Sequence, residues 1–354
     1  MTAEDRKEYF RLRPIRIAAS IILCIILLLV AIYSLSVNSF EMTMIDAWNA
    51  VIDRIKGIPP IDYYHEMIDY VAIDVNAPRT IAGIFIGAIL GIAGAVMQTV
   101  TRNPLADPYT IGISSAALFG VTISVIFGVC VIPIFSGDAS NGINAFVFAM
   151  IPAIAIVMVS SFKKLTPTMM ILIGIGLMYL FSSITTMLKF NASEEKLQEI
   201  YSWSIGTLTG ITWDNVLPII IAFAIVLIVL MAIANKINIL TAGDNITHAL
   251  GENPVLIRMI CFVVSSFGVA ICVCYSGTIG FVGLVAPHIA RIITGNKVSA
   301  LIPASALIGG AFIIIGDVIV RSIPGGLPVG VITALIGSPM FIYFLYKSRK
   351  QANF

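Results

Sequence analysis

Ionisable side chains are rare in the apolar stretches of this sequence, so each one is a candidate for chemistry. Asp317 and Arg321 stand four residues apart, and a helix would place them on one face, where they can form an ion pair. Arg321 could instead face outward toward an acidic partner, and Asp317 could supply the intramembrane carboxyl of a proton-coupled carrier. His288 follows Pro287 in another apolar run, where a structural hydrogen bond is favoured over a ligand contact or a proton relay.

The sequence lacks the motifs of the common catalytic and cofactor sites. Cys272 and Cys274 are close together, but no further thiol or histidine is near enough in sequence to complete a metal site, so buried small side chains are favoured. There is no Gly-x-x-x-x-Gly-Lys-Ser/Thr phosphate loop, no His-Glu-x-x-His and no Gly-x-Ser-x-Gly. We therefore expect no catalytic residue, no metal site, no bound cofactor and no ATP hydrolysis by this chain. A net charge of only +2 does not suggest a nucleic-acid partner.

The elements that position these residues are long apolar segments. Of the 354 residues, 58% are hydrophobic and 11% are charged, so lipid rather than water must surround most of the surface. A helix needs about 20 apolar residues to cross a bilayer. Such segments lie near 17–37, 78–100, 110–133, 143–161, 168–189, 216–234, 255–275, 278–294, 300–321 and 329–347. The sequence thus predicts an all-α integral membrane protein, a single domain over 1–354 with about ten transmembrane helices.

The distribution of basic residues predicts the orientation. With ten spans both termini lie on one side, and 15 of the 21 lysines and arginines then fall on that side. The positive-inside rule makes it the cytoplasm, so residues 1–16 are predicted to be cytoplasmic. Residues 17–37 are too long an apolar run for a cleavable signal and read as the first membrane helix. We expect a multi-pass protein of the cell membrane.

Three connecting segments are longer than tight turns. Segments 38–77 and 190–215 are predicted on the outer side, and the aromatic residues of the second suit a membrane interface. Segment 235–254 is predicted on the inner side. Thr241 or Asp244 could cap a short helix there, and Gly251 could end it. Such an exposed helix would be a docking place for a soluble partner.

Glycine and proline patterns mark close contacts between helices. Gly83, Gly87, Gly91 and Gly94 recur on one face of the second span, which favours tight packing, with the lining of a substrate path as the alternative. The eighth span contains Gly280, Gly283 and Pro287, which indicate a bent or tightly packed helix. Between the second and third spans, Pro104 and Pro108 fix a rigid loop, either a plain inner turn or a constriction at the inner mouth of a pore.

Several strings, in order along the chain from about residue 70, resemble those of one family. They are Pro78-Arg79-Thr80, Gly94-Ala95-Val96-Met97-Gln98, Asn103-Pro104-Leu105-Ala106-Asp107-Pro108, Gly112-Ile113-Ser114-Ser115, Trp203 with Gly206, Ala249-Leu250-Gly251, Gly280-Phe281-Val282-Gly283-Leu284-Val285-Ala286-Pro287-His288, Asp317, Leu327-Pro328-Val329-Gly330 and Gly337-Ser338-Pro339. With them the chain resembles the FecCD-type permease subunits of type II ABC importers for iron–siderophore complexes, haem and vitamin B12. The two longest strings are the most specific.

The resemblance implies an assembly and a mechanism. A second permease subunit, two cytoplasmic ABC ATPase subunits that use the ATP, and an extracytoplasmic substrate-binding protein would complete the importer. The ATPases would drive alternating access. A homodimer is expected, and pairing with a homologue stays open, as does the substrate: iron–siderophore complexes are favoured over haem and cobalamin.

The resemblance also implies roles for particular residues. The ATPase-coupling segment would include Leu240, Gly243, Asp244, Ala249, Leu250 and Gly251, and the inner gate Asn103 and Leu105. Arg79 and Arg321 would meet acidic residues of the binding protein. Asn76 stands where many members have another arginine, which would weaken that docking unless Arg54 and Lys56 substitute. A stand-alone secondary transporter or channel is the alternative; a membrane enzyme is a distant third, since no catalytic constellation is present.

Overall fold

A computed structural model describes residues 3–37, 42–134, 137–162, 166–323 and 325–352, and throughout these ranges the secondary structure is helical, without strands. The first half holds α1 (Ala3–Ser34), α2 (Met44–Lys56), α3 (Tyr63–Asp69), α4 (Ala77–Thr101), α5 (Ile113–Phe127), α6 (Asp138–Phe162) and α7 (Pro167–Phe190). The second half holds α8 (Glu194–Ser204), α9 (Trp213–Ala232), α10 (Ala234–Thr241), α11 (Asp244–Ala249), α12 (Pro254–Ser276), α13 (Val282–Thr294), α14 (Val298–Ser322) and α15 (Val329–Ala352).

Each of the ten predicted segments contains an apolar helix. In the described residues six helices are long and apolar enough to cross a membrane, namely Tyr63–Thr101, Ala139–Ser160, Pro167–Phe190, Trp213–Ala232, Pro254–Ser276 and Val298–Ser322. The other four are shorter: Ala18–Ser34, Ile113–Phe127, Val282–Thr294 and Val329–Phe344. The all-α membrane architecture is therefore confirmed, while the count of ten crossings and the side on which the termini lie stay predictions.

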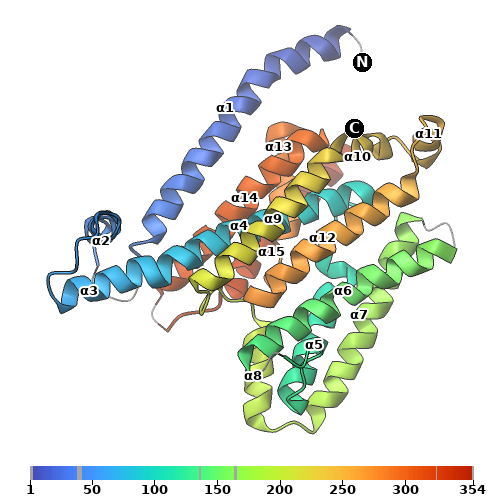
Figure 1. Ribbon diagram of the computed structural model, residues 1–354. Helices are drawn as coiled ribbons and strands as arrows, with labels where there is room; N and C mark the ends of the chain where they lie inside the picture. The colour runs from blue at the N-terminus through green and yellow to red at the C-terminus, as the bar shows by residue number, and fades with distance from the viewer. Residues whose placement is uncertain (1–2, 38–41, 135–136, 163–165, 324, 353–354) are drawn as a thin grey trace.

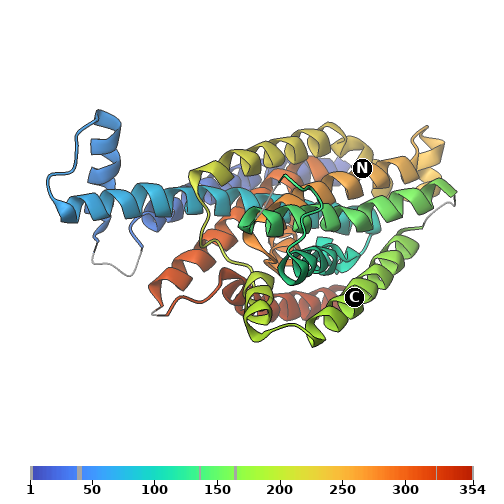
Figure 2. The same cartoon turned by 60° about the horizontal axis from the view of Figure 1, so that its bottom comes forward.

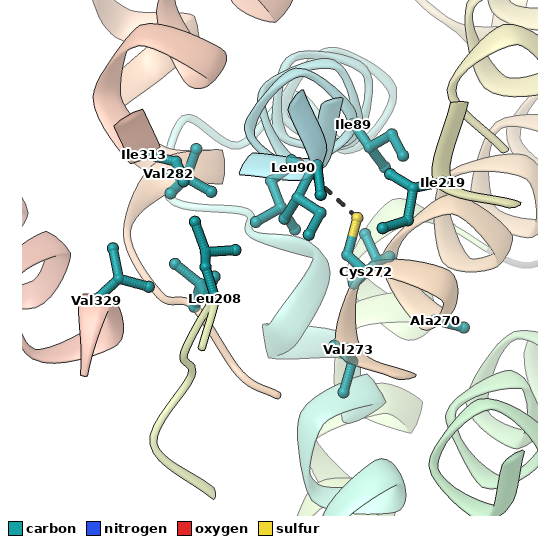
Figure 3. Packing of buried hydrophobic residues seen from close by; sticks show 14 of the residues in the cluster. Ile89, Leu90, Leu208, Ile219, Ala270, Cys272, Val273, Val282, Ile313 and Val329 are labelled. Carbon is teal, nitrogen blue, oxygen red and sulfur yellow. Dashed lines mark hydrogen bonds between the residues drawn. The ribbon is translucent and has the colours of Figure 1, made fainter. Parts of the chain in front are cut away.

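The helix α4 is the central element of the bundle. It packs against α9, α12, α13 and α14, and most of its residues are buried. Figures 1 and 2 show it running through the middle of the molecule, between α14 and α12. In Figure 3, Ile89 and Leu90 of α4 meet Cys272 of α12 within one apolar cluster, and the Cys272 thiol lies 3.8 Å from the Ile86 carbonyl. The glycine-spaced span thus forms the core.

Part of the segment predicted on the outer side, residues 63–76, extends α4 beyond the bundle, and residues 38–41 of that segment lie outside the described ranges. The helix α3 and a π-helical stretch, Tyr70–Asn76, continue directly into α4, giving 39 consecutive helical residues. At 1.5 Å per residue this is about 58 Å, well over the roughly 30 Å of a hydrocarbon core. The helix α2 lies crosswise over the projecting part, as both views show (Figures 1 and 2). Arg54 of α2 fastens it by ion pairs to Asp69 and to Asp74, the latter at 2.9 Å.

Two spans are shorter than predicted. The third was expected over 110–133, but its helix ends at Phe127, where Gly128 takes a left-handed conformation with φ of 67°. The eighth was expected from residue 278, but α13 begins at Val282. Gly277 and Phe281 have φ of 65° and 68°, values that a right-handed helix cannot include.

The irregular backbone before α13 is hydrogen-bonded to another part of the chain. Gly206 N–H donates to the Thr278 carbonyl at 3.0 Å, and Thr207 N–H donates to the Ser276 carbonyl at 2.8 Å. Gly330 N–H in turn donates to the Gly206 carbonyl at 2.8 Å. Non-helical backbone is tolerated at membrane depth only when protein satisfies its polar groups. Here segment 204–207 supplies these hydrogen bonds. The pattern of apolar residues alone could not predict that the helix begins only after them.

Candidate functional site

The segment 235–254 forms two short helices at one end of the bundle, opposite α2 and α3 (Figure 1). The predicted cap is wrong: Gly243 is the N-cap of α11, and Thr241 closes α10 with its hydroxyl donating to the Asn238 carbonyl at 2.7 Å. Gly251 does follow the end of α11. Its φ of 80° turns the chain, and its N–H donates to the His248 carbonyl at 2.9 Å. This left-handed glycine after a helix is a common helix stop.

The short helix α11 exposes an apolar tip. Leu250 is 61% exposed and Ile246 is 49% exposed, and Ala249 and Gly251 beside them are also exposed. Leu240, in the last turn of α10, is by contrast fully buried. Of the coupling residues implied by the resemblance, Leu240 is thus buried, whereas Ala249, Leu250 and Gly251 are exposed. Ile246 and Leu250 form a small exposed apolar surface at the tip of α11.

The loop after α4 holds the two residues implied as an inner gate. The Asn103 side chain accepts a hydrogen bond from Leu105 N–H at 3.0 Å, and its carbonyl accepts one from Ala106 N–H at 3.1 Å. This local turn fixes the loop and leaves the Leu105 side chain 45% exposed. The structure thus supports the rigid loop inferred from the prolines; the gating role stays a prediction.

One carboxylate joins this loop to α11. Asp244 accepts from Arg102 Nη2 at 2.7 Å and from Arg258 Nη2 and Nη1 at 2.6 and 2.8 Å. Hydrogen bonds from Arg258, assisted by the charge of Arg102, lower the pKa of Asp244 despite its partial burial. Sequence reasoning placed Asp244 on the coupling segment but missed both arginines. Both arginines stand at the ends of apolar runs, and this position could have indicated that they lie near the coupling segment.

The glycines of α4 lie against other backbones. An added Cβ would stand 2.2 Å from the Gly309 carbonyl oxygen at Gly87, 2.2 Å from the Ser305 oxygen at Gly91, and 1.9 Å from the Gly283 oxygen at Gly94. At Gly83 it would meet side chains, Ile314 at 2.7 Å and Leu208 at 2.8 Å. Glycine is thus required for the close approach of α14 and α13, as membrane helix packing predicts.

Gln98 of α4 supplies a hydrogen bond that Pro287 of α13 cannot supply. Proline has no N–H, so Pro287 leaves the carbonyl of Gly283, four residues earlier, without its helical donor. Gln98 Nε2 donates to that carbonyl at 3.2 Å, and its amide oxygen accepts from Arg291. Gly280, however, has no described atom within 4 Å of where a Cβ would stand, so tight packing does not explain it.

His288 makes the structural hydrogen bond that its sequence context favoured. Its Nδ1 lies 2.7 Å from the Leu284 carbonyl, and its ring stacks on Phe344 with centroids 5.9 Å apart.

At the opposite end, Asp317 is clamped by the two arginines predicted for docking. Arg79 donates to Asp317 Oδ1 through Nε at 2.9 Å and Nη2 at 2.6 Å. Arg321 Nε lies 2.9 Å from Oδ2, confirming the ion pair, although the angle is not that of a hydrogen bond. Asp317 is fully buried, and the arginine side chains are only 11% and 7% exposed.

Arg321 and Asn76 also bind the backbone at the end of α1. Arg321 Nη1 donates to the carbonyls of Ser34 and Val37 at 2.7 and 2.9 Å, and Asn76 Nδ2 donates to the Leu35 carbonyl at 2.8 Å. Asn76 therefore has a structural role of its own. A cavity of about 590 Å³ opens beside this cluster, and Arg79, Arg321, Asn76 and Thr207 are among its lining residues.

Comparison with known proteins covers nearly the whole chain. A model of the FecCD transport family matches residues 26–347. The cobalamin import system permease protein BtuC of Halobacterium salinarum is 36% identical over 276 residues, covering 77% of this chain and 72% of that protein. The Fe(3+)-citrate import system permease protein YfmE of Bacillus subtilis is 32% identical over 348 residues, covering 94% and 96%.

A solved structure has the same fold. It is an inward-facing conformation of a metal-chelate type ABC transporter, with a TM-score of 0.80 and 29% identity, covering 93% of this chain and 99% of that one. The helices, the ordered motifs and the family model agree: the chain is a multi-pass membrane protein that belongs to the FecCD transport family.

Proposed function

We propose that this chain is the permease subunit of an ATP-driven importer of metal chelates. The observation that carries the proposal is the apolar tip of α11, where Ile246 and Leu250 are exposed on a short helix at one end of the bundle. Both side chains would become buried if a soluble partner docked on this tip, and burial of apolar surface is favourable. An ABC ATPase is the partner that the similar solved structure implies, since that structure is of an ABC transporter.

The assembly follows from the same relatives. Two ATPase subunits would dock on α11 and its copy, a second permease subunit would complete the path, and a substrate-binding protein would deliver the ligand from outside. A homodimer is the simplest arrangement. ATP would be bound and hydrolysed by the partner subunits, and both termini of this chain would face the cytoplasm, as the basic residues indicate.

The gate and the outer docking site occupy opposite ends of the proposed path. Leu105 is exposed at the end of α4 nearest α11, where it can meet its counterpart in a second copy. Arg79 and Arg321 line the outer cavity, so an acidic side chain of the binding protein could reach them there. Their low exposure and their bonds to Asp317 imply that docking would have to compete with an existing ion pair.

The substrate is proposed to be an iron–siderophore complex, with haem and cobalamin as the next candidates. The relatives named above import iron citrate and cobalamin, which share a large size and a bound metal. Discrimination among them would lie mainly in the binding protein.

The alternative, a stand-alone secondary transporter or channel, would need an intramembrane charge that is free to act. Asp317 was the candidate, and both of its oxygens face arginines. A carboxylate held in this way is suited to structure rather than to a proton relay.

The test is co-purification from a host that expresses the neighbouring genes. We expect a tag after Phe354 to recover an ABC ATPase in equal amount, and we expect the double variant Ile246→Asp, Leu250→Asp to lose it. The matched control is Ile55→Asp, Ile61→Asp, which charges two exposed residues outside the membrane spans, at the end opposite α11, and should retain the ATPase. Recovery of the permease alone, in a form that still transports, would overturn the proposal.

A further inference from the structure

The proposed inner end of the molecule contains a charge cluster, of which one member is fully buried, that the proposed function does not itself require. It consists of Asp244 at the start of α11, Arg102 at the end of α4, and Arg258 on α12. Arg258 is fully buried, yet it presents two nitrogens to the Asp244 carboxylate, at 2.6 and 2.8 Å. Arg102 donates to the same carboxylate at 2.7 Å. One anion therefore holds two cations from different helices.

Both arginines also bond to backbone carbonyls across the same junction. Arg258 Nε donates to the Val100 carbonyl in the last turn of α4 at 3.1 Å. Arg102 Nη2 donates to the Leu240 carbonyl in the last turn of α10 at 2.8 Å. The end of α4 and the turn between α10 and α11 are thus joined twice, once through each guanidinium. Charge-assisted bonds of this kind are about twice as strong as neutral ones.

The backbone at Arg102 makes the junction sensitive to displacement. Arg102 has a φ of 51°, a left-handed conformation that is uncommon for a residue with a side chain. Asn103 and Leu105 follow at once, and their turn is fixed by the Asn103 side chain. A displacement of the Arg102 side chain would therefore act directly on the backbone at the start of the loop.

We propose that the Arg102–Asp244 ion pair is the link by which movement of α11 reaches the gate loop. The inference rests on the proposed function, because it requires an ATPase that moves α11. When α11 shifts, Asp244 carries Arg102 with it, and the loop bearing Leu105 changes its position. Arg258, anchored in the bundle, is the fixed point about which Asp244 moves.

A second ion pair in the same segment offers a control. Lys236 of α10 and Glu252 after α11 lie 3.0 Å apart, and their bond joins two parts of the segment without touching α4. If the segment needs only to be held together, both pairs should matter equally. If force passes through Arg102, only the Arg102–Asp244 pair should affect coupling.

The experiment compares Arg102→Asn with Lys236→Asn in the complete importer, reconstituted in vesicles with its ATPase and binding protein. Asparagine tolerates the left-handed backbone but is too short to reach Asp244. The readout is substrate imported per ATP hydrolysed. We expect Arg102→Asn to lower this ratio about tenfold while the ATPase stays bound and active, since allosteric coupling energies typically correspond to changes of about 5- to 150-fold. Lys236→Asn should leave it within about twofold.

Two further variants separate coupling from folding. Arg102→Lys keeps a cation that can donate to both acceptors, so it should restore most of the ratio. Adding Asp244→Asn to Arg102→Asn should lower the ratio no further than the stronger single variant, because both remove the same link. A parental ratio in Arg102→Asn, or an equal loss in Lys236→Asn, would overturn the inference. Absence of ATPase binding to the parental protein would instead contradict the proposed function.

Discussion

The guanidinium of Arg79 and the carboxylate of Asp317 lie 2.6 Å apart, although their residues are separated by more than two hundred positions in the chain. The contact fastens the start of α4 to the last turns of α14. Arg321, one turn after Asp317, extends the cluster to the end of α1. Three helices are therefore held at this end of the bundle by one buried carboxylate.

Replacing that carboxylate should be strongly destabilising. In Asp317→Ala, two largely buried arginines lose their shared partner, and breaking a buried ion pair by removing one member costs roughly 3–5 kcal/mol. We expect a clear fall in the thermal unfolding midpoint of the detergent-solubilised protein. Asp214→Asn, which changes an exposed acid at the start of α9, is the control and should unfold as the parent does. Equal midpoints for Asp317→Ala and the parent would refute a structural role for the cluster.

The helix contact at Gly87 should not tolerate a methyl group. A Cβ there would stand 2.2 Å from the Gly309 carbonyl oxygen, so α4 and α14 would have to separate. Gly87→Ala should therefore greatly reduce the yield of folded protein. Gly176→Ala in α7 is the matched control, because the described residues leave open space around that Cβ. Alanine favours a helix by about 1 kcal/mol over glycine, so the control should be neutral or more stable. Similar yields for both variants would contradict the close packing.

Gln98 should matter because Pro287 cannot donate a hydrogen bond. In Gln98→Ala the Gly283 carbonyl is left without a donor, at a cost of about 1–3 kcal/mol for a buried polar group. We expect a lower thermal midpoint in Gln98→Ala. The double variant with Pro287→Ala regains a backbone N–H, so it should recover part of the loss. No recovery in the double variant would show that Gln98 stabilises the protein in another way, such as through Arg291.

Gly251→Trp should uncouple transport from ATP hydrolysis. The φ of 80° at Gly251 disfavours any side chain, and the open space around it means that an indole would project from the α11 tip. We expect the amount of substrate imported per ATP hydrolysed to fall while binding-protein docking is retained. Gly210→Trp is the control, since Gly210 has a φ of 85° and is equally open within the described structure, but lies between α8 and α9. Import at the parental rate, with normal ATPase stimulation, in Gly251→Trp would contradict a docking role for the tip.

Acid should weaken the stabilisation that the Arg258–Asp244 ion pair provides. Hydrogen bonds from Arg258 lower the pKa of Asp244, so its carboxylate adds stability at neutral pH, where it is ionised in both the folded and unfolded protein. That contribution is lost as the pH falls below the ordinary aspartate value of 3.8 and through the lowered folded pKa. The difference in unfolding midpoint between the parent and Asp244→Asn should thus be constant from about pH 8 to pH 5 and shrink below about pH 4. A difference that grows on acidification would refute this assignment.

The sequence by itself determined the membrane architecture, because apolar runs of about 20 residues have no other stable environment. It also located the glycine face of α4 and the short helix before Gly251, since these depend on local spacing and local backbone preferences. Asp317 and Arg321 could be paired for the same reason, being one helical turn apart.

Only the tertiary structure decided which distant groups meet. Asp244 looked like a helix cap, but Gly243 is the N-cap of α11, and the Asp244 carboxylate instead accepts from two arginines, at the end of α4 and on α12. The start of α13 depended on hydrogen bonds from segment 204–207, and the role of Gln98 depended on the carbonyl that Pro287 leaves free. Each of these contacts joins residues far apart in the chain, where spacing carries no information and the geometry of packing sets the partner.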